Sequence, residues 1–255
     1  MYSCSIVDLA LDFVPDLRSV HWRRRIPQSD NSKDRLALYL GIELEVEQED
    51  SNNGYNFLNH LKKIGLHKLY SVSDECSLDT LDGLELKTIP FKPHYFDKLQ
   101  LKQVCELLKQ YNFYISKHCG LHIHVNRNYL SLRGINILCK LIYLELPKTF
   151  KKLSRRKVFD WCNFSYFHIN TLGEFVTIKE SALYITSRTI EFRFFQGTLD
   201  YNTIKDCVDT VLLCIRWAKL LERRRVLPDL SEHFLTYVSQ SKVPVSKKIC
   251  RLVRR

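Results

Sequence analysis

The stretch Gly41-Ile42-Glu43-Leu44-Glu45-Val46-Glu47 alternates acidic and apolar residues. Successive side chains of a β-strand point to opposite faces, so the three glutamates would share one face and the three apolar residues the other. A second stretch, Thr189-Ile190-Glu191-Phe192-Arg193-Phe194, repeats the alternation with one acid and one base. Charged residues at alternate positions are unusual for a plain core strand, and the like charges of the first stretch repel one another unless a cation lies between them.

The composition is that of a folded globular chain with an excess of positive charge. The 255 residues are 45% hydrophobic and carry a formal net charge of +11. A chain of this length forms one sizeable domain or two small ones. The charge favours an anionic partner such as a nucleotide, a nucleic acid or an acidic polymer. Basic residues gather at 23–25, at 148–157 and in the tail 223–255, where a solvated surface is the ordinary interpretation.

The nine cysteines indicate free thiols rather than a disulfide framework or a zinc site. Their number is odd and none forms a C-x-x-C pair. Cys105, Cys139, Cys207 and Cys214 lie in apolar helical patterns, where free cysteine behaves as a small buried hydrophobe. We therefore expect a reducing, cytoplasmic location. The sequence shows no signal peptide and no apolar run long enough for a membrane span, so we expect no membrane partner.

Hydrophobic periodicity predicts strands and helices in alternation. The predicted strands are 36–47, 68–72, 84–89, 120–126, 167–170 and 189–195. The predicted helices are 55–64, 96–110, 130–146 and one that Asp200 caps. This pattern predicts an α+β domain whose sheet has one face packed on helices and the other open. We expect an N-terminal arm over 1–35, a catalytic domain over 36–222 and a basic helical extension over 223–255.

Histidines join the acidic residues on the predicted open face. His122 and His124 stand two residues apart in the strand 120–126, and Glu85 lies in the strand 84–89. Taken alone, the glutamates of the first strand fit a solvated face, and Glu191 with Arg193 fits an ion pair. Neither interpretation explains the whole set. Carboxylate oxygens beside imidazole suit Mg²⁺ or Mn²⁺ better than zinc.

Four motifs occur in an order that resembles the amidoligase family. They are GIELEVE at 41–47, DECSLDTLDGLELKTIP at 74–90, CGLHIHVNR at 119–127 and TIEFRFFQGTLD at 189–200. The family has phage, bacterial and fungal members and belongs to the carboxylate-amine ligase superfamily, with glutamine synthetase. The resemblance covers roughly 36–200. It implies a glutamine synthetase-like domain with a mostly antiparallel, curved sheet and an open metal- and nucleotide-binding face.

The resemblance also implies a set of metal ligands. They are Glu43, Glu45, Glu85, His122 and Glu191, with one more carboxylate from the second motif. The family usually has an aspartate two residues before the serine of that motif. Here Glu75 holds that spacing and Asp74 lies beside it, so both remain candidates.

Further residues match the family's nucleotide and catalytic positions. The resemblance places His124 near the nucleotide phosphates, and Arg193 on the transferred phosphoryl group. Arg155 or Arg156 adds phosphate contacts. Arg193, Glu191 and Glu85 are the implied catalytic residues. The cofactors implied are ATP and Mg²⁺ or Mn²⁺, which would neutralise the nucleotide beside the carboxylates.

The implied activity is an ATP-dependent ligase that forms an amide or peptide-like bond through an acyl phosphate. The acid and the amine, which in such enzymes can be peptide or macromolecular, are not readable from the residues, nor is the oligomeric state. One alternative is a non-catalytic nucleic-acid-binding protein on the same scaffold, using the basic tail with Trp217, Phe234 and Tyr237. The other is a metal-dependent hydrolase, which spacing alone does not separate from a ligase.

Overall fold

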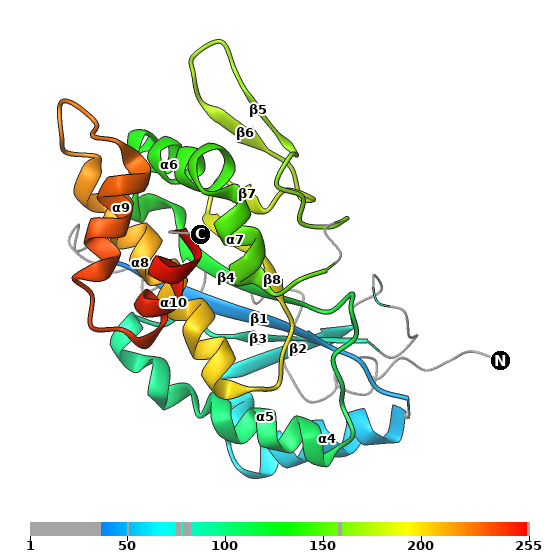
Figure 1. Cartoon of the computed structure of the whole chain (residues 1–255). Coiled ribbons are helices and arrows are strands. Elements are labelled where there is room, and N and C mark those ends of the chain that lie inside the picture. Colours follow the sequence, from blue (N-terminus) through cyan, green and yellow to red (C-terminus); the bar gives the residue numbers. More distant parts are fainter. Residues whose placement is uncertain (1–36, 50, 75–77, 79–82, 158–159, 254–255) are drawn as a thin grey trace, which may run out of the picture. The chain divides into compact units, whose positions relative to one another are not determined.

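The fold combines helices with a six-stranded sheet (Figure 1). A computed structural model describes residues 37–49, 51–74, 78, 83–157 and 160–253. The larger sheet has the strand order β2-β3-β1-β4-β8-β7, and β5 and β6 form a separate pair. The chain divides into two compact units. The first holds the described residues up to His124 together with Gln196–Tyr201, and the second holds the remainder.

The strands of the first unit bring the predicted acidic residues onto neighbouring positions. They are β1 (Leu40–Val46), β2 (Tyr70–Asp74), β3 (Leu84–Thr88) and the greater part of β4 (Gly120–Asn126). β3 pairs antiparallel with both β1 and β2. In this register Glu45 faces Glu85 and Glu43 faces Lys87, while Ser73 is the β2 partner of Glu85. Directly opposed residues share one face of a sheet, so the acidic row continues from β1 to β3.

Two helices lie on the same side of β1–β3 (Figure 1). They are α4 (Ser51–Lys63) and α5 (Leu101–Gln110), joined to the sheet by the 3-10 helices η2 (Leu66–Lys68) and η3 (Pro93–Leu99). Phe57 and Leu108 are fully buried in this layer. The helix predicted over 96–110 is divided in two, because Gln100 has a φ of 53° and the left-handed backbone ends the first helix there.

Helices dominate the second unit. They are η4 (Arg127–Tyr129), α6 (Leu132–Cys139), η5 (Lys140–Glu145), α7 (Pro147–Ser154), α8 (Tyr201–Leu221), α9 (Leu230–Ser239) and α10 (Pro244–Val253). The predicted helix 130–146 changes to a π-helical turn at Lys140. The helical backbone is interrupted at Leu146, whose φ is -127°, and Pro147 begins α7. Proline suits that first helical position because its missing N–H has no partner to lose there.

The strands of the second unit are short except for one. They are β5 (Phe167–Ile169), β6 (Phe175–Thr177), β7 (Leu183–Ile185) and β8 (Thr189–Gln196), whose last residue belongs to the first unit. β5 pairs with β6 and β7 with β8, both antiparallel. The sequence analysis predicted β5 but neither β6 nor β7, each of which has three residues.

Buried aromatic rings join the C-terminal helices to α8. Trp217 and Phe234 are fully buried, with ring centroids 5.2 Å apart in an edge-to-face arrangement. The indole Nε1 of Trp217 donates to Nδ1 of His233 at 3.0 Å. Both rings are part of the core, so Trp217 and Phe234, which the nucleic-acid alternative grouped with the basic tail, do not offer an exposed surface. The predicted burial of the four helical cysteines is confirmed, and burial raises the pKa of Cys105 and Cys207 to about 12.

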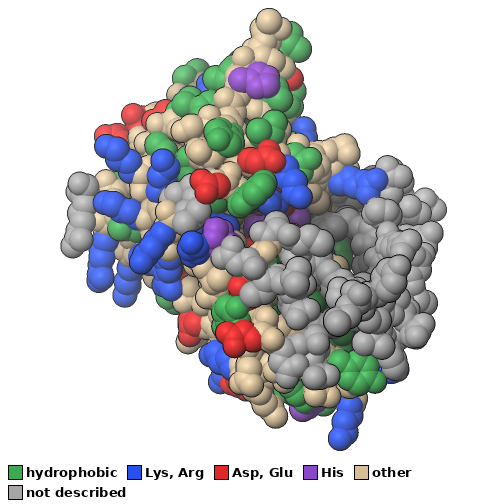
Figure 2. All heavy atoms as spheres, turned by 90° about the vertical axis from the view of Figure 1, so that its right-hand side faces the viewer, with side chains coloured by type: hydrophobic (Ala, Val, Ile, Leu, Met, Phe, Trp, Pro, Cys, Tyr) green, Lys and Arg blue, Asp and Glu red, His purple; other side chains and the backbone are tan. Residues whose placement is uncertain are grey.

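No helix within the described residues is both long and apolar enough to cross a bilayer. Basic side chains gather toward the left of Figure 2.

Candidate metal centre

Three strands of the first unit bring two carboxylates and an imidazole together. Glu43 on β1, Glu85 on β3 and His122 on β4 each offer one ligand atom, and these atoms all lie within 4.8 Å of one another. Glu85 and His122 are buried, and the Glu43 side chain is 12% exposed. We call these three residues the Glu–Glu–His cluster. The sequence predicted all three as metal ligands, but on an open face. The open-face expectation is wrong for these side chains, since the polar row is largely shielded from solvent.

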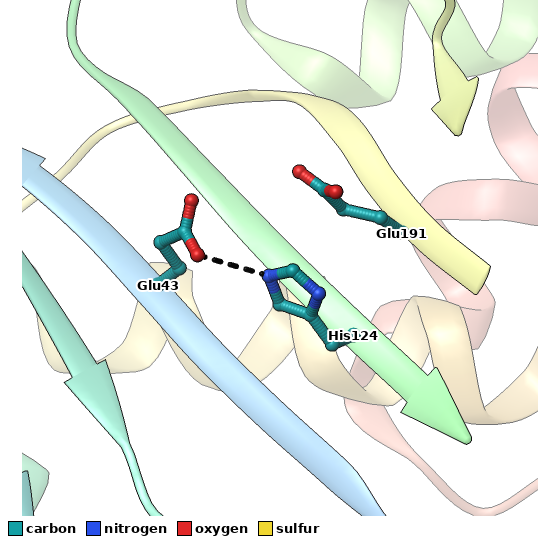
Figure 3. A group of neighbouring side chains, drawn as sticks. All are labelled: Glu43, His124 and Glu191. Atoms are coloured by element: carbon teal, nitrogen blue, oxygen red, sulfur yellow. Dashed lines mark hydrogen bonds and ion pairs between the residues drawn. The ribbon is translucent and has the colours of Figure 1, made fainter. Parts of the chain in front are cut away.

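Glu43 is the centre of the hydrogen-bond network. Its Oε1 lies 2.9 Å from Nδ1 of His122, and its Oε2 lies 3.2 Å from Nε2 of His124. Figure 3 shows the second contact, with Glu43 on β1 and His124 on β4. The alternation of β4 places both imidazoles on one face, as the sequence predicted.

Glu45 supports the cluster from beside it. Its Oε2 accepts a hydrogen bond from the backbone N–H of Gly120, and its Oε1 lies 3.6 Å from Nε2 of His122. Each ring nitrogen of His122 thus faces a carboxylate. Such second carboxylates fix the orientation of a ligating histidine. We therefore describe Glu45 as a residue that positions His122 and not as a member of the Glu–Glu–His cluster.

Lys87 is a cationic neighbour that the sequence analysis did not single out. Its ammonium contacts Oε2 of Glu85 and lies 3.6 Å from Oε2 of Glu43. The Lys87 side chain is 42% exposed, so its ammonium has access to solvent as well. The signal was present in the sequence, because Lys87 stands two residues after Glu85 and shares its face of the strand.

The two carboxylates of the cluster carry different charges. Burial, together with a hydrogen bond to Glu43 and the charge of Glu43, raises the pKa of Glu85 to about 9, although Lys87 opposes this shift. Burial also acts to raise the pKa of Glu43, but hydrogen bonds from Glu85, His122 and His124 hold that pKa well below its usual range. Glu85 is therefore protonated at neutral pH and donates to ionised Glu43, as in other carboxylate pairs that share a proton.

These donors fit a divalent cation. Two carboxylate oxygens and one imidazole nitrogen form a set that Mg²⁺ tolerates and Mn²⁺ favours. The raised pKa of Glu85 and the nearby ammonium of Lys87 indicate that the carboxylates require compensating positive charge. Burial raises the cost of leaving such charge uncompensated.

Glu47 lies at the end of the same strand but is not the solvated residue that the sequence suggested. Only 1% of it is exposed, and the hydroxyl of Ser116 donates to its Oε1 at 2.8 Å. Cys119 lies 3.9 Å from the same oxygen, and burial raises the pKa of its thiol to about 11. Glu47 therefore belongs to a separate polar group before β4.

Of the remaining predicted site residues, four lie in the second unit. Arg193 donates to Glu191 on β8, so the ion pair weighed as an alternative does form. Arg156 is buried, and its Nη1 lies 3.4 Å from the carbonyl of Arg193. Arg155 is exposed and donates to Oγ1 of Thr203 on α8 at 2.7 Å. The structure thus separates the two arginines that the sequence left as equals.

The choice between Asp74 and Glu75 stays a prediction. Asp74 is the last residue of β2, where it pairs with Leu84. Glu75 lies outside the described residues.

No protein-family model matches the sequence, and no curated protein matches it. Among solved structures, the chain is similar to Plasmodium falciparum glutamine synthetase determined by cryo-electron microscopy. The TM-score is 0.42 and the sequence identity is 11%. The match covers 75% of this chain and 53% of that chain, so this chain spans about half the length of the protein it resembles.

Proposed function

We propose that the protein is a divalent-cation-dependent ligase, which uses ATP to activate a carboxylate and joins it to an amine. The observation that carries this proposal is the approach of Glu43, Glu85 and His122 to within 4.8 Å in a shielded site. The four-motif resemblance adds the reaction class, because a cation site alone also suits hydrolysis. The acid, the amine and any macromolecular substrate stay unassigned.

The chemistry requires positive charge near the phosphates. A carboxylate oxygen attacks the γ-phosphorus of ATP and ADP leaves; the amine nitrogen then attacks the acyl carbon, and phosphate leaves as the nitrogen loses a proton. A bound divalent cation neutralises phosphate oxygens during the transfer. Glu43, Glu85 and His122 are the residues that would hold it, with Glu45 orienting His122. His124 lies beside the cluster, where its Nε2 forms a hydrogen bond with Glu43.

The resemblance assigns separate roles to residues of the second unit. Glu191 is proposed as a cation ligand and Arg193 as the donor that stabilises the transferred phosphoryl group. Arg156 is the better of the two candidate phosphate contacts, because it contacts the Arg193 backbone while Arg155 contacts Thr203. We test these assignments separately from the Glu–Glu–His cluster. Loss of one transition-state donor costs about a hundredfold in rate.

The first experiment measures cation binding and turnover on the same protein. Titration with Mn²⁺, followed by calorimetry, reports the cation site directly. ADP release is then measured with Mg-ATP and pooled carboxylates and amines. We expect Glu43→Gln to abolish Mn²⁺ binding and ADP release together, and Arg193→Gln to reduce ADP release about a hundredfold while Mn²⁺ still binds.

Controls distinguish the loss of a cluster carboxylate from the loss of any other acidic residue. Glu106→Gln removes an exposed carboxylate from α5 and should change neither measurement. ADP release that requires neither acid nor amine would indicate hydrolysis in place of ligation. Unchanged turnover in Glu43→Gln would reject the proposed site.

A second candidate function follows from Lys87. An ammonium already paired with both cluster carboxylates can substitute for a metal, which would make the site structural and the protein non-catalytic. In that case the natural chain would not bind Mn²⁺, whereas Lys87→Met would gain binding. If the ligase proposal holds, the natural chain binds Mn²⁺ and the Lys87 ammonium moves away from the two carboxylates.

A further inference from the structure

Two helices of the second unit form a continuous basic surface. α7 and α10 pack against each other, and their basic residues are Lys148, Lys151, Lys152, Lys247, Lys248 and Arg251. Neither helix contains an acidic residue. Five of the six side chains are exposed and Lys248 is half-buried. Figure 2 shows basic side chains crowded together toward its left. We call this the α7–α10 surface.

A small crevice at the edge of this surface brings two cations together. Arg155, Lys248 and Thr203 line it, and Asp206 is the acidic residue among its lining residues. Burial lowers the pKa of Lys248, and the charge of Arg155 lowers it further, although Asp206 opposes this. An anion that enters the crevice would interact favourably with both cations.

The size of the crevice indicates what kind of anion fits. Its volume is about 10 Å³, which is room for one water-sized group. A phosphate oxygen fits this space, but a nucleotide or other small molecule does not. A phosphate backbone that lies across the surface can place a single oxygen in this crevice.

We propose that the α7–α10 surface binds the phosphate backbone of double-stranded nucleic acid, without reading its sequence. Nucleic-acid backbones are bound chiefly by Lys and Arg through charge and counterion release, and such binding needs no apolar contact. The α7–α10 surface provides this chemistry.

Other anionic partners fit this surface less well. Membrane-binding helices place large apolar side chains into the bilayer, whereas Phe150, Leu153, Val245 and Ile249 of these helices are buried in the protein. Protein interfaces need an apolar or aromatic centre. Single strands are held by stacking on exposed aromatic rings, and the one aromatic residue of the two helices, Phe150, is fully buried.

The experiment measures fluorescence anisotropy of a labelled mixed-sequence 20-base-pair DNA duplex, with chelator present so that the result does not depend on the metal centre. We expect micromolar binding at about 50 mM salt, weakening about a thousandfold by 200 mM if six phosphates are contacted. Lys148→Gln/Lys151→Gln/Lys152→Gln on α7 should weaken binding at least tenfold and reduce the salt slope by about 2 to 3. Lys247→Gln/Arg251→Gln on α10 should reduce the slope by about 2.

The matched control removes the same charge from another part of the chain. Lys63→Gln/Lys102→Gln/Lys109→Gln alters three exposed lysines of α4 and α5 and should change affinity less than twofold. An equal loss in this control would show that net charge alone is responsible and would overturn the proposal. The proposal would also be overturned if the α7 variant bound as well as the natural chain, or if no duplex bound at low salt. Equal affinity for a single strand or for anionic lipid vesicles would overturn it as well. Circular dichroism confirms that each variant is folded.

Discussion

Glu43 and Glu85 are the same residue type, yet their surroundings give them opposite charge states. Glu85 keeps a proton because it is buried beside an ionised carboxylate, and Glu43 loses its proton because three donors converge on it. Enzymes use such pairs wherever one carboxyl must be a donor and the other an acceptor. If the cluster binds a cation as proposed, the raised pKa of Glu85 couples that binding to the release of a proton.

Cation binding should therefore tighten as pH rises. Glu85 must lose its proton to become a ligand, and its pKa is about 9. We expect the Mn²⁺ association constant to rise about tenfold per pH unit between pH 7 and 9, with one proton released. Calorimetry in buffers of different ionisation enthalpy measures both. Glu106→Gln should keep the slope, whereas a flat profile in the natural chain would contradict the assignment of Glu85.

The same shift predicts how stability depends on pH without a cation. The folded pKa of Glu85 lies above its ordinary value of 4.5, so between pH 4.5 and 9 the folded state binds a proton that the unfolded chain has lost. This contribution to stability is complete below pH 4.5 and disappears as pH rises through 9. In chelator, the free energy of unfolding by urea should fall between pH 6 and 9. In Glu85→Gln the free energy of unfolding should fall less steeply over the same pH range. An identical fall would show that a group other than Glu85 causes the pH dependence.

Lys87 and Glu43 should be energetically coupled. Lys87→Met keeps the aliphatic stem but removes the ammonium, and should destabilise the cation-free protein by about 1 kcal/mol, since the side chain is partly exposed. In a Glu43→Gln background the same change should cost less, because the paired charge is gone. Urea unfolding of the four proteins completes the cycle. If the two substitutions are additive, the interaction between the Lys87 ammonium and Glu43, 3.6 Å apart, does not contribute to stability.

The sequence identified the cluster because alternation in a strand fixes which residues share a face. Glu43, Glu85, His122 and His124 were all predicted and are all found together. It did not anticipate the burial of Glu47, because Ser116 and Cys119 approach it from a distant part of the chain. Nor did it separate Arg155 from Arg156, since a left-handed backbone at Arg155 redirects the two side chains.

At the scale of elements, strand and helix cores follow the hydrophobic pattern, while their ends follow backbone geometry. β4 spans the predicted 120–126. The helix predicted over 130–146 holds its apolar face but changes to π-helix at Lys140, which local periodicity does not report. Such ends depend on φ angles and tertiary contacts that composition leaves open.

A close approach of two strand ends gives a test of packing in the first unit. The backbone N–H of Gly197 donates to the carbonyl of Cys119 at 2.9 Å, and a Cβ at Gly197 would lie 3.0 Å from that same oxygen. Gly197→Ala should destabilise the protein by about 1–3 kcal/mol through overpacking against backbone. Urea unfolding measures the loss. Lys117→Ala, at an exposed residue nearby, should stay within about 0.5 kcal/mol. Equal losses of stability in Gly197→Ala and Lys117→Ala would mean that the backbone moves apart at this contact without cost.

At the scale of the whole molecule, the C-terminal helices are part of a core. The sequence predicted a basic extension over 223–255 beside a domain ending at 222, and that division stays a prediction. Phe234 is nevertheless fully buried and its ring lies 6.4 Å from that of Phe150 on α7. The basic residues of α10 are thus carried by a helix whose other face packs on the unit.

Removal of this packing should be costly. Phe234→Ala should lose about 3–5 kcal/mol, because it leaves a cavity against Trp217. Truncation after residue 222 should expose Trp217, shifting its fluorescence to longer wavelength and causing aggregation. Val226→Ala serves as the control, since that side chain is 82% exposed. A truncated chain that stays monomeric and unfolds as the full chain does would show that the extension is separable.

The ammonium of Lys87 has a practical consequence for handling the protein. A chain whose carboxylates already hold an internal counter-charge does not rely on an added ion to fold, unlike a zinc finger, which unfolds without its metal. Purification in chelator would yield a well-behaved sample with no sign that anything had been removed. Thermal-shift screening would understate binding as well, because an arriving ion replaces an ion pair that was already contributing. Direct titration is the appropriate assay for this site.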